Sequence, residues 1–387
     1  MFDKVYEPQE ESIMLREEVR KFAKGRVLDM GTGSGILAQA ALEKPDVTDV
    51  LAVDLNPHAV RYVRKRGIKA IKSDLFKKVT GIFDTIIFNA PYLPEDLREK
   101  KDEHSMAVCG GKEGWEIIER FFSQVSQHLA EDGIILLLFS SLTNRKKVDG
   151  IIAERLFEST LLMDKRYFFE NVYIYLIRKS YLLNELESHN LADIKFYAKG
   201  KRGVVYRADY LGKKVAVKTE NPASKAVEQI KNEINILREL NRYGIGPEIY
   251  FSDRNWLVMD FIEGELIGDF LKRASKSEIV SVLKSILNTC SELDQLGINK
   301  QEMNHPRKHI IIDKKLHPVF IDFERARKTS RPKNVGQFVQ YIISSNTSKI
   351  LNEKRINMDK AKMIARVKDY LKEMNQASLD KIISGIS

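Results

Sequence analysis

The sequence predicts two domains: an α/β fold with a doubly wound, mostly parallel sheet in residues 1–180, and an α+β fold in residues 181–387. In the first domain, short strand-like runs rich in β-branched residues alternate with helical stretches, a pattern typical of parallel strands buried on both faces. In the second domain, strand-like runs come first and helices follow, which is the order of an α+β domain. A chain of 387 residues is long for one core and ordinary for two.

The elements follow in order along the chain. Six apolar runs are expected to form the strands of the first sheet: 26–30, 50–54, 70–74, 84–90, 133–141 and 171–179. The spacing of apolar residues between them predicts helices over 36–44, 58–67 and 115–133. A further helix over 180–190 is either a linker or the first element of the second domain. That domain should continue with three strands at 195–200, 204–212 and 213–220 and a helix over 226–241. A strand pair should follow within 248–264, and helices from there to the end.

Composition limits the class of protein. No run of 18 or more apolar residues occurs, and the first residues are acidic and polar, which argues against a membrane span and a secretion signal. The two cysteines, Cys109 and Cys290, fall in different halves, so a structural disulfide is not expected and a reducing compartment fits. We therefore expect a cytoplasmic protein with no membrane partner.

The positive charge is unevenly placed. The chain carries 64 basic and 54 acidic residues, of which residues 1–180 hold 28 of each, so all of the net charge of +10 lies in the second half. A basic domain predicts an acidic partner such as RNA or the ribosome. A solvated, lysine-rich helical surface is the other interpretation of the same excess.

A glycine-rich turn follows the first strand-like run. Asp29 lies near the end of that run, and Gly31, Thr32, Gly33 and Gly35 come before a helical stretch. Glycines let the backbone approach a ligand closely, and a helix N-terminus offers free N–H groups. The G-x-G-x-G spacing after an aspartate differs from the G-x-G-x-x-G of dinucleotide sites and favours S-adenosylmethionine. Asp29 is expected either to hold the turn or to meet the positively charged amino-acid end of that cofactor.

Two more aspartates, Asp54 and Asp74, end the second and third runs. A carboxylate at Asp54 can accept hydrogen bonds from both ribose hydroxyls, and Asp74 could bind the adenine amine. Each aspartate alone could be a turn or capping residue. Three of them at the carboxyl ends of successive parallel strands predict a cofactor site, because ligands bind there in such folds.

The fourth run ends in Asn89, Ala90, Pro91 and Tyr92, which resembles the N-P-P-Y signature of methyltransferases acting on glutamine amides or adenine amines. A planar nitrogen is a poor nucleophile because its lone pair is delocalised. The resemblance implies that the Asn89 side-chain oxygen and the Ala90 carbonyl each accept one N–H of the target, while Tyr92 packs against the flat substrate group. Ala90 departs from the first proline of the signature: the carbonyl is kept, but the preset φ is lost.

The resemblance extends beyond this motif. Residues 5–10 (VYEPQE) and 109–115 (CGGKEGW) resemble the archaeal and eukaryotic branch of the HemK-type methyltransferases, and the similarity covers residues 1 to 180. It implies a class I, Rossmann-like enzyme that methylates the glutamine of the Gly-Gly-Gln loop in class I peptide-chain release factors. It also implies a small zinc-binding activator subunit. The extra N-terminal helical domain of bacterial relatives is lacking, so substrate contacts are expected from the loop after Tyr92 or from the second domain.

The second domain carries motifs in the order found in protein kinases. Gly200 and Gly203 precede Lys218, the last residue of V-A-V-K, which matches the strand whose lysine pairs with nucleotide phosphates. Glu233 lies on the next predicted helix, where it could pair with Lys218, and Met259 lies on the strand leading to an adenine-binding hinge. Over residues 190–345 the set resembles the small archaeal relatives of RIO-type kinases and the kinase of the tRNA threonylcarbamoylation complex. The resemblance implies a minimal kinase-like domain that binds ATP.

The catalytic part of that pattern is less complete. Asp322, in F-I-D-F-E, matches the D-F-G aspartate that binds Mg²⁺, with Glu324 in place of the glycine. Glu302 is the best match to the catalytic aspartate, and His309 falls on the metal-binding asparagine if two residues are inserted. Neutral imidazole is a poor ligand for Mg²⁺. The domain is therefore either a divergent Ser/Thr kinase or ATPase, or a nucleotide-binding pseudokinase.

The sequence thus predicts an S-adenosylmethionine-dependent N-methyltransferase of release factors, joined to a kinase-like domain that uses ATP and Mg²⁺. One rival keeps the enzyme but makes its substrate an adenine in RNA or DNA, with the basic second half as a nucleic-acid anchor. The other rival is a scaffold on the ribosomal machinery whose kinase-like half is inert.

Overall fold

The computed structural model describes residues 8–94, 109–200, 203–220 and 229–386, and it divides the chain into two units, Met1–Lys195 and Phe196–Ser387. The expected boundary at residue 180 is therefore too early. Helix α7 (Tyr181–Ser188) belongs to the first unit, because Leu183 and Leu186 are buried and the Asn184 amide donates to the carbonyl of Glu131 at 3.3 Å. The helix is thus part of the first fold, not a free linker.

The first unit is built on a seven-stranded sheet in the order β3-β2-β1-β4-β7-β9-β8. The strands are β1 (Gly25–Met30), β2 (Val47–Asp54), β3 (Lys69–Lys72), β4 (Phe83–Asn89), β7 (Leu129–Ser140), β8 (Phe157–Arg166) and β9 (Asn171–Lys179). The pairs from β3 to β7 are parallel, and β9 runs antiparallel to both β7 and β8. The strand order reverses between β1 and β4, so a ligand is expected at the carboxyl ends of these two strands.

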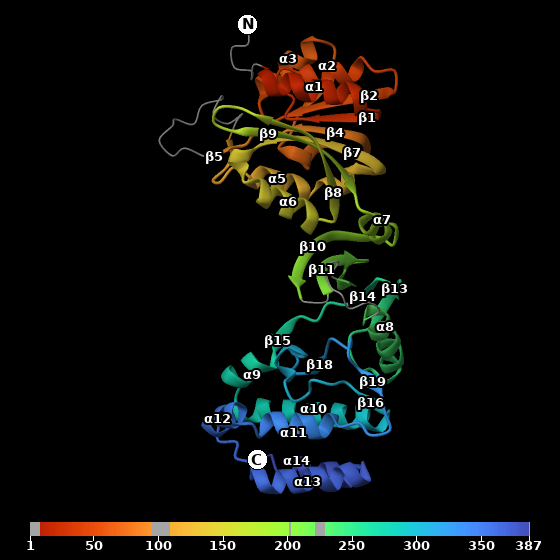
Figure 1. Ribbon diagram of the computed structural model, residues 1–387, viewed down its shortest axis with the longest axis vertical. Coiled ribbons are helices and arrows are strands. Elements are labelled where there is room, and N and C mark those ends of the chain that lie inside the picture. The colour runs from red at the N-terminus through yellow and green to blue at the C-terminus, as the bar shows by residue number, and fades with distance from the viewer. Residues whose placement is uncertain (1–7, 95–108, 201–202, 221–228, 387) are drawn as a thin grey trace. The chain divides into compact units, whose positions relative to one another are not determined.

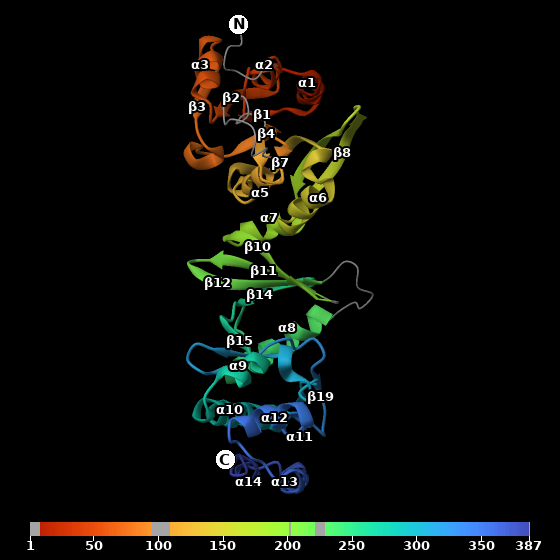
Figure 2. The same ribbon diagram turned by 90° about the vertical axis from the view of Figure 1, so that its left-hand side faces the viewer.

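Helices cover both faces of this sheet. Helices α1 (Glu10–Phe22), α2 (Ile36–Leu42) and α3 (Pro57–Lys65) lie on one face, and α5 (Glu116–Phe122) and α6 (Arg145–Glu154) on the other (Figures 1 and 2). Three short 3₁₀ helices and a small strand pair complete the unit: Leu75–Lys78, Val125–His128, Ser141–Thr143, β5 (Leu93–Pro94) and β6 (Cys109–Gly111). The start of α3 is set locally, since the Asn56 side chain accepts a hydrogen bond from the His58 N–H and Pro57 takes the first helical position.

The predicted doubly wound sheet is confirmed, and each of the six expected runs forms a strand. Two details differ. The helix expected over 115–133 ends at Phe122, because β7 already begins at Leu129. Strand β8 was not expected at all: it lies at the edge of the sheet, most of its residues are exposed or partly exposed, and its sequence lacks a continuous apolar run.

The second unit begins with a five-stranded sheet in the order β10-β11-β12-β14-β13. Its strands are β10 (Leu191–Lys199), which crosses the boundary, β11 (Gly203–Tyr210), β12 (Lys213–Glu220), β13 (Ile249–Ser252) and β14 (Trp256–Asp260). Helix α8 (Gln229–Leu240) lies between β12 and β13 in the chain, and a 3₁₀ turn, Asn241–Tyr243, follows it. Strands from β11 to β13 pair antiparallel.

The rest of the second unit is mainly helical. The helices are α9 (Ile267–Arg273), α10 (Lys276–Gln295), α11 (Asn334–Ile342), α12 (Ser345–Glu353), α13 (Lys360–Glu373) and α14 (Gln376–Ile383). Short strands and a 3₁₀ turn interrupt them: β15 (Gly264–Leu266), β16 (Ile298–Asn299), Pro306–Lys308, β17 (Ile310–Asp313), β18 (Pro318–Phe320) and β19 (Arg327–Lys328). The expected α+β layout is present, although these short strands were not predicted. None of the described helices is both long and apolar enough to cross a membrane.

Candidate functional site

A cavity of about 310 Å³ lies at the carboxyl ends of β1, β2 and β4, where the strand order reverses. The predicted residues that line it are Gly31, Thr32, Gly33, Asp54, Asp74, Asn89, Ala90, Pro91 and Tyr92. Apolar side chains, among them Met30 and Phe88, complete its wall. The structure therefore brings most of the residues predicted for cofactor and methyl transfer into one cavity.

Asp29 and Gly35 are absent from the cavity wall and shape the glycine turn from behind it. The Asp29 carboxylate accepts hydrogen bonds from the Thr32 hydroxyl at 2.6 Å and from the Ala38 N–H at 3.2 Å. Gly35 has φ +79°, and a Cβ there would come 3.0 Å from Val63. Of the two roles expected for Asp29, the geometry matches the first: it holds the turn. Burial raises the pKa of Asp29 to about 6.

The other two aspartates differ in their surroundings. The Asp54 oxygens accept from the backbone N–H groups of Gly33 and Asn56, at 2.9 and 2.8 Å, and burial raises the pKa of this carboxyl. Each oxygen keeps a second lone pair, so Asp54 can still accept from ribose hydroxyls. Asp74 is paired with Lys77 and with Arg120, each at 2.8 Å, and these hydrogen bonds hold its pKa below the usual range. Arg120 also lines the cavity.

The orientation of the Asn89 amide is fixed by a contact that the sequence did not reveal. Its Nδ2 donates to the hydroxyl oxygen of Ser12 at 3.2 Å, and Ser12, on α1, is buried and also lines the cavity. With the nitrogen held there, the Oδ1 atom lies on the opposite side of the amide as an acceptor. Ser12 is 77 residues away in sequence, so no local pattern could have indicated it.

Ala90 replaces a proline of the signature, and the structure gives a physical reason why the turn keeps its shape. The Ala90 N–H donates to the carbonyl of Leu138 in β7 at 3.2 Å, a bond that proline could not make. Ala90 is 1% exposed. The hydrogen bond therefore takes over part of the restraint that a proline ring would supply.

Tyr92 stands at the same cavity and is half-buried against the apolar cluster of the first unit. Burial, together with the negative charge of Glu170 and Glu11, raises the pKa of Tyr92, so its hydroxyl stays protonated at neutral pH. Residues 95–108, where substrate contacts were expected after Tyr92, lie outside the described residues, and so do residues 5–7 of the resemblance at the start of the chain.

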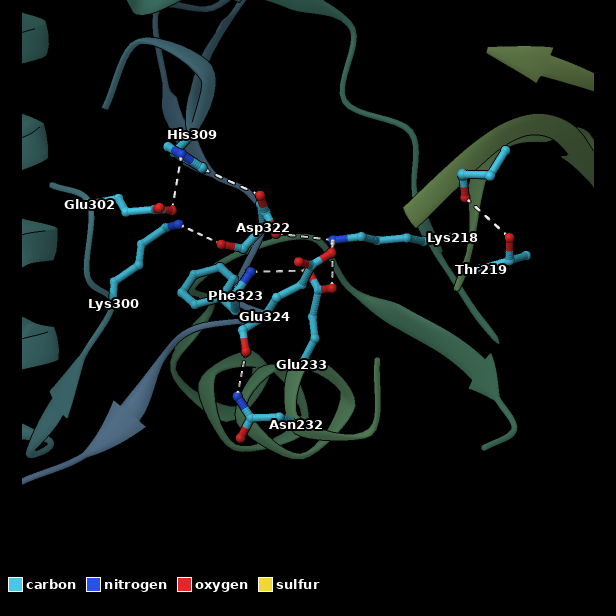
Figure 3. Close-up of polar contacts among 11 residues, drawn as sticks. Lys218, Thr219, Asn232, Glu233, Lys300, Glu302, His309, Asp322, Phe323 and Glu324 are labelled. Atoms are coloured by element: carbon cyan, nitrogen blue, oxygen red, sulfur yellow. Dashed lines mark hydrogen bonds and ion pairs between the residues drawn. The ribbon is translucent and has the colours of Figure 1, made fainter. Parts of the chain in front are cut away.

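A second cluster of charged groups centres on Lys218 in the second unit (Figure 3). Its Nζ lies 2.7 Å from Glu233, 3.1 Å from Asp322 and 2.9 Å from Glu324. Burial alone would lower the pKa of Lys218, but the three carboxylates raise it above its usual value. The predicted pair of Lys218 and Glu233 is thus present, and Glu324 is a further partner that sequence reasoning did not assign to this lysine.

Asp322, Glu302 and His309 also come together (Figure 3). His309 lies between the two carboxylates, with Nε2 3.4 Å from Glu302 and Nδ1 3.5 Å from Asp322. Burial would raise the pKa of Asp322, but His309, Lys218 and Lys300 hold it well below the usual range. Glu302 also pairs with Arg325. In this geometry His309 lies between two carboxylates, and its role as a metal ligand stays a prediction.

Lys300 is a site residue that sequence reasoning missed, although it stands two residues before Glu302. It is 2% exposed, and its Nζ donates to the carbonyl of Asp322 at 2.7 Å. Burial lowers the pKa of Lys300 to about 8. The backbone here is strained: Gln301, Glu302 and Asp322 all have positive φ, between +57° and +63°. Such strain in non-glycine residues often accompanies functional sites.

The remaining predicted ATP residues lie on the sheet of the second unit. Gly203 begins β11, whereas Gly200 directly follows the end of β10, and its N–H donates to the Gly203 carbonyl at 2.8 Å; residues 201–202 lie outside the described part. A Cβ on Gly203 would come 3.1 Å from the Thr219 carbonyl and 3.6 Å from the Glu324 carboxylate. Met259, on β14, belongs to the apolar core of the unit. Strand β11, which begins at Gly203 and which we call the glycine strand, thus passes close to the Lys218 cluster.

Comparison with known proteins gives a family for the first unit. Residues 10–170 match the model of the methyltransferase small domain. A Methanocaldococcus jannaschii protein, provisionally named a protein N5-glutamine methyltransferase, is 39% identical over 150 residues, which cover 37% of this chain and 76% of that protein. The human methyltransferase HEMK2 is 25% identical over 185 residues, or 43% of this chain and 85% of the human protein.

Bacterial relatives are longer than the matching region. The Deinococcus radiodurans release factor glutamine methyltransferase is 32% identical over 135 residues, 31% of this chain, and the chain spans 48% of its length. Among solved structures, the E. cuniculi Mtq2–Trm112 complex, responsible for methylation of the termination factor eRF1, contains a chain 27% identical to this one. It covers 46% of this chain and 99% of its own length at a TM-score of 0.39.

The predicted recognition of the first unit is confirmed at this level. The identity to the archaeal relative extends over three quarters of that protein, and the cavity residues described above lie within the matched region. By its first unit, the chain belongs to the family of S-adenosylmethionine-dependent protein N5-glutamine methyltransferases.

Proposed function

We propose that the first unit methylates the side-chain amide of the glutamine in the Gly-Gly-Gln loop of a class I peptide-chain release factor. The observation that carries the proposal is the Asn89 amide, which lines the cavity and whose nitrogen donates to Ser12 at 3.2 Å, so that the amide oxygen serves as the acceptor. The names of the Deinococcus and E. cuniculi relatives, which refer to release or termination factors, support the substrate.

The acceptor groups explain how an unreactive amide is used. The glutamine nitrogen has two N–H groups, and the Asn89 oxygen and the Ala90 carbonyl can each accept one. These two hydrogen bonds fix the plane of the amide and polarise its N–H bonds, so that the lone pair of the nitrogen is directed toward the methyl group. S-adenosylmethionine supplies that methyl from its sulfonium centre. A nitrogen–carbon bond would form as the sulfur–carbon bond breaks, and the proton lost from the nitrogen would pass to water.

The cavity residues fit this cofactor. Gly31 and Gly33 have positive φ, at +69° and +51°, which lets the backbone pass close to a ligand. Asp54 can accept from ribose hydroxyls, and Asp74, paired with Arg120, lines the same cavity. The small zinc-binding activator subunit remains a prediction of the resemblance.

The test uses the purified chain, methyl-labelled S-adenosylmethionine and a class I release factor. Label should appear on the glutamine of the Gly-Gly-Gln loop, identified by mass spectrometry, and should be absent when that glutamine is replaced in the substrate. Transfer RNA, ribosomal RNA and DNA are offered in parallel. Label in a nuclease-sensitive product would contradict the release-factor substrate and favour the adenine-methylating rival.

For the second unit we infer a divergent, Ser/Thr-kinase-like nucleotide-binding function. The specific observation is the buried pair of Lys218 and Glu233 at 2.7 Å, with Asp322 3.1 Å from the same lysine. Kinases need this pair and this aspartate together to hold nucleotide phosphates and Mg²⁺. Asp322 offers an oxygen ligand to Mg²⁺, whereas His309 is occupied between two carboxylates.

ATP turnover and autophosphorylation by the full chain separate an active from an inert second unit. Turnover that disappears in both Lys218→Ala and Asp322→Ala supports the kinase or ATPase and excludes the inert scaffold. Nucleotide binding without turnover supports a pseudokinase. The contact of the basic second half with RNA or the ribosome stays a prediction from charge.

A further inference from the structure

Two adjacent phenylalanines at the tip of the β8–β9 hairpin are almost fully exposed to solvent. Phe168 and Phe169 are 93% and 88% exposed, and their rings pack only edge to face on each other among the described ring contacts, at 4.7 Å. The Tyr167 N–H donates to the Glu170 carbonyl at 2.7 Å and closes the turn that carries them. We call residues 167–170 the aromatic tip. Exposed apolar pairs of this kind mark interaction surfaces.

The aromatic tip is anchored to β7, the strand that supports residues 89–92. We call these four residues, which hold the proposed hydrogen-bond acceptors, the acceptor loop. Glu170 accepts a hydrogen bond from the hydroxyl of Ser140, the last residue of β7, and the Asn171 N–H donates to the Ser141 hydroxyl at 3.0 Å. Two residues before Ser140, the Leu138 carbonyl holds the Ala90 N–H at 3.2 Å. One strand therefore holds both the acceptor loop and the tip.

The tip is anchored from a second side by α1. The Tyr167 hydroxyl lies 4.0 Å from the sulfur of Met14, and Lys165 pairs with Glu10. Helix α1 also carries Ser12, which orients the Asn89 amide. Tyr92 and Tyr167 pack against the same apolar cluster. The tip also acts electrostatically on Tyr92. Burial is the main cause of the raised pKa of Tyr92, and Glu170 and Tyr167 raise it further.

We propose that the aromatic tip is a docking element for the polypeptide that carries the methyl acceptor, with Phe168 and Phe169 inserting into an apolar depression on the surface beside its glutamine loop. This proposal rests on the proposed function and names how the same site selects a folded protein. The tip is positioned by the two elements that shape the acceptor loop, so a partner bound there presents a loop to Asn89 and Tyr92. Aromatic side chains are the anchors that most often dominate protein interfaces.

Charge favours a polypeptide over a nucleic acid as the occupant. Residues 1–180 carry 28 basic and 28 acidic residues, so this domain has no net attraction for a phosphate backbone. Beside the tip, Lys165 in β8 is engaged with Glu10, and within the tip Glu170 is an acid that would repel phosphates. Stacking of flipped bases on the two rings is an outcome that the test must exclude.

The test measures kcat and KM of methyl transfer to an intact class I release factor. In the double variant Phe168→Ala/Phe169→Ala we expect KM to rise by about tenfold or more, with kcat changed less than about threefold and S-adenosylmethionine binding unchanged. The double variant to Leu, which keeps apolar side chains, should recover part of the loss. Leu42→Ala is the matched control, because Leu42 is an exposed apolar residue of the same unit, 46% exposed, outside the cavity wall.

Each result decides the question. An unchanged KM in the alanine variant, or an equal change in Leu42→Ala, overturns the docking role while leaving the proposed function intact. A fall in kcat with KM constant also overturns it, since the tip would then act on the chemistry. If the wild-type chain labels RNA or DNA and the alanine variant lowers that label, the occupant is a nucleic acid. A release factor left unlabelled by the wild type contradicts the proposed function and the docking role with it.

Discussion

The two units handle their polar groups in opposite ways. In the first, Asn89 and Asp54 line a cavity of about 310 Å³, and the Asp54 oxygens accept hydrogen bonds from backbone N–H groups. In the second, Lys218 is already bonded to three carboxylates of its own unit. A site whose acceptors are held in place and left for a ligand is preorganised for chemistry. A site whose lysine is already paired with carboxylates of its own unit must exchange at least one of these ion pairs when a phosphate binds.

The largest effect expected from this contrast is at Asn89. Asn89→Ala removes one of two acceptors that orient the target nitrogen, so methyl transfer should fall by about 10²–10³-fold, as when one preorganised polar group is lost from an active site. S-adenosylmethionine affinity should change little. Single-turnover transfer to the release factor and equilibrium binding of the cofactor measure the two effects separately.

Ser12→Ala is the companion variant for that prediction. It leaves the Asn89 oxygen in place but releases the nitrogen that Ser12 holds at 3.2 Å, so a smaller loss, about tenfold, is expected from misorientation. Full activity in Asn89→Ala would refute the acceptor role. Equal losses in both variants would mean that Ser12 does more than orient the amide.

A second prediction concerns the buried carboxyl behind the glycine turn. Burial raises the pKa of Asp29 from 3.8 to about 6, and its Oδ1 is buried without a hydrogen-bond partner among the described residues. Because the folded state binds this proton more tightly, the stabilising contribution is complete below pH 3.8 and disappears as pH rises through about 6. The difference corresponds to about 3 kcal/mol. Asp29→Asn cannot ionise, so its unfolding free energy relative to wild type should increase by about that amount between about pH 4 and about pH 7.

The chain offers a direct way to follow this. It has two tryptophans, Trp115 in the first unit and Trp256 in the second, so a Trp256→Phe background leaves Trp115 fluorescence to report the first unit during urea unfolding. If the stabilities of the wild type and of the Asp29→Asn variant stay parallel over the whole pH range, Asp29 is ionised at its usual pKa. That result would remove one half of the contrast between the units.

How far the sequence could predict these sites depends on whether a signal is local. The glycine turn, Asp54, Asp74 and the Asn89–Tyr92 motif were predicted because each sits at the end of an apolar run, and parallel strands bring such ends together. Strand β8 could not be predicted, since its exposed edge position leaves no apolar alternation to detect. The boundary at residue 180 was wrong because the amphipathic pattern of α7 does not say which core receives its apolar side.

Contacts between distant segments were beyond sequence reasoning. Ser12 meets Asn89 across 77 residues, and Lys300 meets the Asp322 carbonyl across 22. A serine near an acidic N-terminus and a lysine in a lysine-rich domain carry no distinguishing pattern. Glu324 was noticed only as a replacement for glycine, whereas its ion pair with Lys218 became visible only in the folded unit.

A third prediction tests whether the second site is closed by its own charge. Glu324 lies 2.9 Å from Lys218 and close to the glycine strand, where a nucleotide phosphate would have to approach. Glu324→Ala removes one of the three carboxylates paired with Lys218 and should tighten ATP binding about tenfold, which calorimetry can measure. Asp369→Ala is the matched control, because it removes an exposed carboxylate of α13 and the same charge without touching Lys218 or the predicted hinge. Weaker binding in Glu324→Ala would make Glu324 a ligand of the bound nucleotide or its metal instead.

The smallest effect is expected at Ala90, where the first site keeps its shape by a hydrogen bond rather than a proline. Ala90→Pro removes the N–H donated to Leu138 at 3.2 Å, so the first unit should lose about 1 kcal/mol of unfolding free energy while methyl transfer stays within about threefold. Ala90→Gly keeps the N–H and loosens the backbone. If the bond holds the turn, the glycine variant should retain the hydrogen bond, seen as slow amide exchange at residue 90, and most of the activity. Faster transfer in the proline variant together with slower transfer in the glycine variant would instead make backbone rigidity the property that positions the carbonyl acceptor.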